Sequence, residues 1–283
     1  MAVPEFLTAF VDDAAIFPPA STDLEQAVAD HRGHRDSEYA ALVGGFVVSD
    51  VKVADLANAV ADSLQVNLVV TGGAGAIEPA VTWVSRSEGL ELRTVEFALR
   101  DEDDLAHNAR RLVQVVDSLD DVLDDVAVFA EPPMLRGVPS YGWLAALDEL
   151  AAREISLKFR TGGLSADLFP GSTELATCIE AALDRELPFK CTAGLHHAVR
   201  NRDDETGFEH HGFLNVLAAT RLAFDGAAPD DVVEMLERRD GEALAADASS
   251  LDLAGARRWF TSFGSCSVTE PLTDLRALGL LGG

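Results

Sequence analysis

The stretch that decides the fold is residues 156–194, SLKFRTGGLSADLFPGSTELATCIEAALDRELPFKCTAG. Each end is a short apolar run followed by a glycine turn, and residues 172–186 repeat apolar side chains with the period of a helix. Strands joined through a helix pair in parallel, because the helix carries the chain back along the sheet. The stretch therefore predicts a strand–helix–strand unit whose strands are buried on both faces.

The same alternation continues along the rest of the chain. Further strand-like runs lie near residue 10, at 44–50, 66–73, 92–99 and 125–133, and, more weakly, within 242–254. Helical patterns separate them, beginning with STDLEQAVADH, where Ser21 or Thr22 is placed to form a capping box with Glu25. Eight such units in 283 residues predict a (β/α)8 TIM barrel, with residues 1–283 as a single domain. A doubly wound open parallel sheet is the alternative, which the lack of a glycine-rich dinucleotide fingerprint disfavours.

The composition is acidic, with a formal net charge of −26. Such a surface repels nucleic acid and anionic membranes, so neither is an expected partner. No apolar run is long enough to cross a bilayer, and MAVPEFLTAF lacks a basic leader, so we expect a cytoplasmic protein. The three cysteines are widely spaced, which predicts free thiols rather than disulfides. A high-salt cytoplasm and GC-rich coding would each produce this acidic, lysine-poor composition.

Lysine is scarce, since Lys52, Lys158 and Lys190 are the only three in the chain. Lys52 fits the first turn of an exposed helix, whereas the other two lie inside predicted barrel strands. A lysine in a strand buried on both faces loses hydration, so it needs a carboxylate partner or a function. An ion pair with Glu131 or Glu96 is one explanation. The other is a Schiff-base lysine, whose pKa would be lowered by burial and by the charge of the second lysine.

Polar residues at the carboxyl ends of the predicted strands are candidates for the active site, because barrel enzymes place their chemistry there. Glu131 could act as a general base or hold a lysine in position. His196 and His197 are candidates for general acid–base catalysis. Arg160 suits a carboxylate or phosphate, because its planar guanidinium offers paired donors. The predicted substrate-binding residues are Arg160, Thr161, Gly162, Gly163, Thr192, Gly194, His211 and Asn215.

LKFRTGG at 157–163 and FKCTAGL at 189–195 together resemble the sixth and seventh strands of the deoxyribose-phosphate aldolase group of barrels, which carry K-x-S-T-G-F and then K-A-S-G-G-[VI]-R. The resemblance implies that Lys158 forms an imine and that Lys190 tunes its pKa. The chain departs from the pattern at Arg160, where the group has serine, and at His196 and His197, where it has no histidine. More broadly, AIFPPA, KFRTGG, FKCTAGLHH, HGFLN and SFGSCSVTEP are together similar to an uncharacterised bacterial family of TIM-barrel-like proteins.

Three hypotheses of function follow from these residues. The first is an aldolase-type lyase without a cofactor, acting on a small anionic carbonyl compound through a lysine Schiff base. The second is a metal-dependent hydrolase, isomerase or lyase, with a divalent metal bound by the cluster from His196 to His211 and a carboxylate such as Glu131. The third is a non-catalytic barrel that binds an anionic metabolite, which the gathering of titratable groups at strand ends disfavours. A small anionic substrate is the expected partner, and a homo-oligomer is left open.

Overall fold

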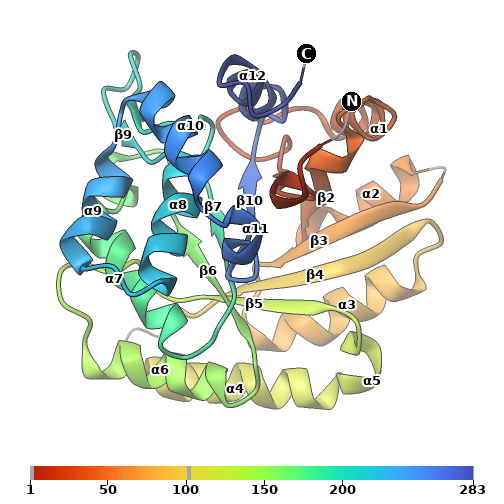
Figure 1. Cartoon of the computed structure of the whole chain (residues 1–283). Coiled ribbons are helices and arrows are strands. Elements are labelled where there is room, and N and C mark those ends of the chain that lie inside the picture. Colours follow the sequence, from red (N-terminus) through yellow and green to blue (C-terminus); the bar gives the residue numbers. More distant parts are fainter. Residues whose placement is uncertain (1–2, 61, 101–102, 283) are drawn as a thin grey trace.

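Eight parallel strands close into a barrel in the order β1-β10-β7-β6-β5-β4-β3-β2, with helices around its outside (Figure 1). The computed structural model describes residues 3–60, 62–100 and 103–282. The predicted TIM barrel is confirmed, and the open doubly wound sheet is wrong, because β1 pairs with both β2 and β10. Within the described ranges, no helix has the length and apolar character needed to span a membrane.

The barrel strands are β1 Val11–Asp13, β2 Val43–Ser49, β3 Leu64–Val70, β4 Leu90–Ala98, β5 Ala127–Glu131, β6 Ser156–Arg160, β7 Phe189–Thr192 and β10 Phe260–Ser265. A short antiparallel pair, β8 Asn201–Arg202 and β9 Glu209–His210, lies in the connection after β7. The α-helices are α1 Leu24–Arg35, α2 Val53–Ala59, α3 Ile77–Arg86, α4 Leu105–Ser118, α5 Asp120–Leu123, α6 Tyr141–Ala151, α7 Ser172–Leu183, α8 Phe213–Phe224, α9 Pro229–Glu237, α10 Gly241–Ser250, α11 Leu253–Ala256 and α12 Thr269–Ala277. Short 3-10 helices are η1 Glu5–Leu7, η2 Ala40–Leu42, η3 Asp50–Lys52, η4 Ala74–Ala76 and η5 Ala166–Leu168.

The eighth barrel strand differs from its predicted place. We expected it within 242–254, but most of that segment belongs to α10, which is rich in alanine and capped by the Asp240 side chain. The strand is β10 instead, where Phe263 stacks on Phe213 of α8 and Ser262 faces the barrel interior. A strand of six residues with three small glycine and serine positions gives a weak periodic signal, which explains the error.

The N-cap of α1 also differs from the prediction. The Asp23 side chain accepts a hydrogen bond from the Glu25 backbone amide, so neither Ser21 nor Thr22 is the cap. Aspartate at this position also places a negative charge near the positive end of the helix dipole. Lys52 lies in η3 and is exposed, as its sequence position indicated.

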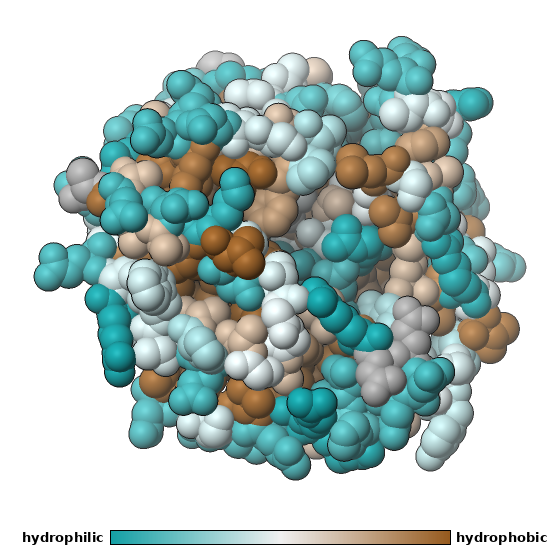
Figure 2. Space-filling model, turned by 180° about the vertical axis from the view of Figure 1, so that it is seen from behind, coloured by the Kyte–Doolittle hydropathy of each residue, from teal (hydrophilic) through white to brown (hydrophobic). Residues whose placement is uncertain are grey.

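The apolar core lies between the barrel wall and the helices. Phe10, Phe263 and Phe213 are fully buried there and contact one another with ring centroids 4.8 to 6.1 Å apart. The outside is mostly hydrophilic on the face opposite to that of Figure 1, where apolar side chains form separate small groups (Figure 2). The centre of the barrel differs from both, because it holds the charged side chains of Asp12, Glu96, Lys158 and Lys190.

Two irregularities in the barrel wall make room for those charges. Asp12 of β1 lies opposite both Gly44 and Gly45 of β2, because Val11 pairs with Val43 whereas Asp13 pairs with Phe46. A methyl group on Gly44 would overlap Oδ1 of Asp12, and the amide of Gly45 donates a hydrogen bond to that oxygen at 3.2 Å. The inserted residue is therefore a β-bulge whose glycines accommodate the aspartate.

A second bulge lies in β4. Val66 and Asn67 are consecutive in β3, but they pair with Leu92 and Thr94, so Arg93 is the extra residue. The bulge turns the Arg93 side chain to Asp12, where Nη1 and Oδ1 are 2.8 Å apart. Bulges often re-aim a side chain in this way, and here the effect is to bring an arginine to the buried aspartate.

Replacing the bulge glycine tests this interpretation. We expect Gly44→Ala to lower the free energy of unfolding by about 1–3 kcal/mol, because the added methyl displaces the Asp12 carboxylate. Gly33→Ala is the control, since Gly33 lies in α1 with no atom within 4 Å of an added methyl group and should gain up to about 1 kcal/mol. Urea denaturation measures both, and a Gly44→Ala protein as stable as the wild type would contradict the role of the bulge.

Candidate active site

The two predicted barrel lysines meet at one glutamate. Lys158 and Lys190 occupy paired positions on neighbouring strands β6 and β7. Glu96 of β4 binds both, with Oε2 2.8 Å from Lys158 Nζ and Oε1 2.6 Å from Lys190 Nζ. All three residues are at most 4% exposed. The centre of the barrel is therefore an ionic cluster in which one carboxylate bridges two ammonium groups.

Asp12 extends the cluster toward the amino-terminal half of the strands. Its Oδ2 lies 2.7 Å from Lys190 Nζ and accepts a hydrogen bond from Ser262 Oγ at 2.7 Å. Its Oδ1 pairs with Arg93, whose side chain is 31% exposed. Both oxygens of this buried carboxylate thus have charged or hydroxyl donors, which offsets the cost of its burial.

Glu131 extends the cluster toward the opposite end of the barrel. Its Oε2 is 3.2 Å from Lys158 Nζ, and its Oε1 is 2.8 Å from Arg160 Nε. Exposure of the side chains rises from 5% at Lys158 to 12% at Glu131 and 35% at Arg160, so the cluster reaches solvent where β5 and β6 end. The ion-pair chain is, in order, Arg93, Asp12, Lys190, Glu96, Lys158, Glu131 and Arg160.

The carboxylates decide the protonation of this chain. Burial would lower the pKa of Lys158, and the charge of Lys190 adds to that effect, but Glu96 and Glu131 outweigh both and raise the pKa above its ordinary value. The pKa of Lys190 is raised in the same way: Asp12 and Glu96 overcome the effect of its burial. The expected lowering of the Lys158 pKa is therefore wrong, because the carboxylates lie in direct contact with the ammonium.

The partners of the lysines show the complementary shifts. Burial alone would raise the pKa of Asp12, but Lys190 and Arg93 lower it to about 2. The pKa of Glu96 is lowered by its two lysines against the effect of burial, and that of Glu131 by Lys158 and Arg160. At neutral pH, four cations and three carboxylates of the chain are all charged, which leaves one excess positive charge.

The predicted glycine and threonine residues after β6 and β7 hold the two turns together. Thr161 is fully buried, and its hydroxyl donates to the carbonyls of Thr192 and Ala193. Gly162 and Gly194 approach so closely that a methyl group on Gly162 would lie 2.8 Å from the Gly194 Cα. Close packing of the two turns therefore explains why these positions are glycine and threonine. Anion binding by the backbone of these turns stays a prediction.

The predicted histidines have partners outside the ion-pair chain. His196 Nδ1 lies 2.8 Å from Glu270, and His197 Nδ1 lies 3.1 Å from Asp274. Both carboxylates belong to α12, which follows the last barrel strand. The structure thus brings Lys158, Lys190 and Glu131 together, whereas His196 and His197 pair with a helix on the rim and make no hydrogen bond or ion pair with these three residues.

His211 and Asn215 lie in a third place. His211 is 1% exposed, between the Pro170 carbonyl and the Arg200 side chain, and burial and Arg200 lower its pKa to about 4. Asn215 accepts from the Arg200 amide and donates to the carbonyls of Met235 and Arg238. Both therefore fix the backbone around α8, and the expected cluster from His196 to His211 does not form, because neighbouring histidines of this loop have different partners.

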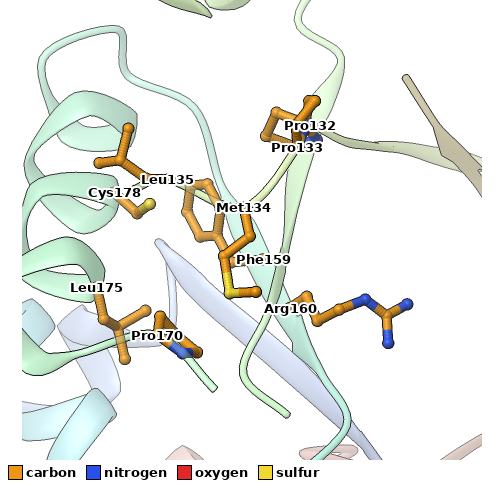
Figure 3. A pocket seen from close by; sticks show the side chains of 9 residues that line it. All are labelled: Pro132, Pro133, Met134, Leu135, Phe159, Arg160, Pro170, Leu175 and Cys178. Carbon is orange, nitrogen blue, oxygen red and sulfur yellow. The ribbon is translucent and has the colours of Figure 1, made fainter. Parts of the chain in front are cut away.

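A small, mostly apolar cavity lies beside β6, with Arg160 among its lining residues (Figure 3). Met134, Phe159 and Leu175 are among its lining residues, and its volume of about 10 Å³ holds at most one water molecule. The Arg160 guanidinium points away from the other labelled side chains in Figure 3. This cavity is too small for a substrate.

Ion pairs of the buried lysines with Glu96 and Glu131 were expected from the sequence and are present, whereas the roles of Asp12, Arg93 and Ser262 were not revealed. Asp12 was visible as a carboxylate in a strand-like run, but its partner Lys190 could not be assigned without the strand order. Arg93 gave no usable signal, because regular alternation of β4 would turn it away from the interior and only the bulge reverses that. Ser262 lies in the strand that was misplaced.

Comparison with known proteins shows which solved structure shares this fold. No family model and no curated protein sequence matches the chain. Among solved structures, it is similar to the tetrameric deoxyribose phosphate aldolase from Aeropyrum pernix, with a TM-score of 0.57 and 13% sequence identity. The alignment covers 98% of this chain and 94% of the aldolase. The shared feature is the TIM barrel, and the local resemblance seen at β6 and β7 lies within it.

The bridging glutamate provides a test of the cluster. We expect Glu96→Gln to lower the free energy of unfolding by about 3–5 kcal/mol, because it removes one carboxylate from two buried lysines. Glu88→Gln, at an exposed position, should change it by no more than about 0.5 kcal/mol. Equal effects of the two substitutions in chemical denaturation would show that the central ion pairs do not hold the barrel.

Proposed function

We propose that the protein is an aldolase-type lyase in which Lys158 forms a Schiff base with a small anionic carbonyl compound. The observation that carries this proposal is the pair of buried lysines bridged by Glu96 at the centre of the barrel. Only a lysine can form an imine, whereas an arginine would serve a purely structural ion pair. The likeness in fold to an aldolase supports the proposal.

Lys158 is the better nucleophile of the two for reasons of position. It contacts Glu131 and, through it, Arg160 at the end of the ion-pair chain where β5 and β6 end. Lys190 is held by Asp12 and Glu96 and is 1% exposed. A substrate that enters where β5 and β6 end meets Lys158 first. Lys190 then supplies a second positive charge, which opposes but does not cancel the rise in the Lys158 pKa caused by Glu96 and Glu131.

Attack on a carbonyl requires a neutral amine, so Lys158 must first give up a proton. Glu131 and Glu96 are both in contact with Nζ and are the available acceptors. Glu131 is the stronger candidate once Arg160 leaves it, because loss of that cation raises the pKa of the carboxyl group. An anionic substrate competes with Glu131 for Arg160, so its binding prepares the base that deprotonates the nucleophile.

The anion requirement follows from the same contacts. Arg160 uses Nε for Glu131 and is 35% exposed, so its remaining donors can reach a phosphate or carboxylate. The ion-pair chain also carries one more cation than anion, which favours a negatively charged ligand. The similar aldolase is a tetramer, which supports self-association of this chain as well.

Borohydride trapping tests the imine. With a panel of small aldehydes and keto acids, we expect reduction to leave a mass adduct on the peptide that contains Lys158. Trapping should become faster as pH rises, because the raised pKa keeps Lys158 protonated near neutrality. Lys158→Arg should abolish both adduct and turnover while the fold survives, and Lys190→Arg should reduce turnover and shift its pH profile.

Lys52→Arg is the matched control, because Lys52 is exposed and lies outside the barrel. It should leave turnover and the Lys158 adduct unchanged. Substantial turnover by Lys158→Arg, together with no adduct at Lys158 in the wild type, would rule out the imine. If chelators abolished the turnover of Lys158→Arg, a metal-dependent mechanism would replace the imine mechanism.

Substitution of Arg160 tests the anion. We expect Arg160→Lys to weaken the binding of inorganic phosphate about tenfold, because one ammonium cannot hold Glu131 and also offer paired donors to the ligand. Titration calorimetry measures the affinity, with Arg86→Lys at an exposed helix position as the control. Equal phosphate affinity of Arg160→Lys and the wild type would show that Arg160 does not bind the anion.

A further inference from the structure

A cysteine, a histidine and a glutamate meet on the rim of the barrel. Cys266 follows the end of β10, His196 lies in the connection after β7, and Glu270 is in the first turn of α12. Cys266 Sγ lies 3.7 Å from Nε2 and 3.9 Å from Nδ1 of His196, and Nδ1 is 2.8 Å from Glu270 Oε2. In Figure 1, α12 lies beyond the end of β10. Three separate segments therefore build this group, here called the rim triad.

The rim triad is separate from the lysine cluster. Ser262, whose hydroxyl binds Asp12, lies four residues before Cys266 along the chain. At about 3.3 Å per residue along a strand, that spacing corresponds to roughly 13 Å. Neither Cys266 nor Glu270 makes a hydrogen bond or ion pair with the buried lysines and their carboxylates. The chemistry proposed for Lys158 therefore leaves the rim triad without a role.

His196 carries a positive charge at neutral pH. Its burial opposes that charge, but Cys266 and Glu270 outweigh the burial and raise the pKa to about 9. The other titratable groups nearby are His197, which pairs with Asp274, and His210, whose pKa is lowered by burial. The imidazolium of His196 thus lies beside the sulfur, and Glu270 binds its Nδ1.

The three cysteines differ in their surroundings. Cys266 is partly exposed, whereas Cys178 and Cys191 are buried. Burial raises the pKa of Cys178 to about 12 and raises that of Cys191 as well, so both remain protonated and unreactive. A thiol beside an imidazolium, with an acid orienting the ring, is instead the arrangement of an activated nucleophile.

We propose that Cys266, His196 and Glu270 form a second reactive site, at which a small carbon electrophile becomes covalently bound to the cysteine sulfur. The sulfur forms a bond to the electrophilic carbon, and the leaving group departs with the electrons of the bond that breaks. The thiol loses its proton to solvent, and the positive charge of His196 stabilises the thiolate that attacks. Cys266 is the reacting group, while Glu270 positions the imidazole.

Iodoacetamide is the probe, since its carbon accepts the sulfur and iodide leaves. On the folded wild-type protein at pH 7, we expect one carboxamidomethyl group, located by mass spectrometry on Cys266, and a rate at least tenfold above that of glutathione. His196→Gln should slow labelling of Cys266 about tenfold, because the cation beside the sulfur is lost. Glu270→Gln should slow it less, because His196 remains.

His210→Gln is the control, because His210 lies in the same loop region but binds the Gly194 carbonyl and packs on Phe169. Its labelling rate should equal that of the wild type, and the melting temperatures of the folded variants should agree. Wild-type labelling no faster than glutathione would overturn the proposal without any variant. So would equal rates for His196→Gln and the wild type, or first labelling at Cys178 or Cys191.

Discussion

The contact on which the rest of the barrel depends is the one between Glu96 and its two lysines. Two ammonium groups on adjacent strands would repel each other strongly in a water-poor interior, and one carboxylate placed between them converts that repulsion into attraction. Each lysine also has a second carboxylate partner, which is Asp12 for Lys190 and Glu131 for Lys158. Asp12 and Glu131 then require their own cations, which Arg93 and Arg160 provide. The barrel wall is irregular at both ends of the contact between Asp12 and Arg93: β2 has glycines opposite Asp12, and β4 has a bulge at Arg93.

This arrangement also limits how the protein can perform chemistry. An amine surrounded by carboxylates is stable as a cation, so reactivity has to be created when a ligand arrives. In the mechanism proposed above, an anionic substrate does so by withdrawing Arg160 from Glu131, which changes the balance of charge beside Lys158. In that mechanism, the contacts that stabilise the barrel also keep Lys158 protonated until a ligand of the right charge binds.

The fold could be predicted from local patterns, whereas the site could be predicted only in part. Alternating strands and helices identify a barrel, because each strand–helix unit has its own periodic signal. Lys158 and Lys190 stand out because charged residues are rare in runs such as SLKF and PFKC. Arg93 could not be found in this way, because a register shift between two strands is invisible in either strand alone. The partners of the histidines could not be predicted for a related reason: His196, His197 and His211 are close in sequence, but the structure gives each a different partner.

The charged interior has a thermal consequence. Unfolding exposes apolar groups, which increases the heat capacity, and polar groups, which decreases it. A barrel filled with lysine, arginine and carboxylate side chains has less apolar surface to expose at its centre than one filled with valine and leucine. Its heat capacity of unfolding is correspondingly smaller, and its stability changes more gently with temperature. The penalty for dehydrating charges also falls on warming, so the ionic interior favours the folded state most at the upper end of the temperature range.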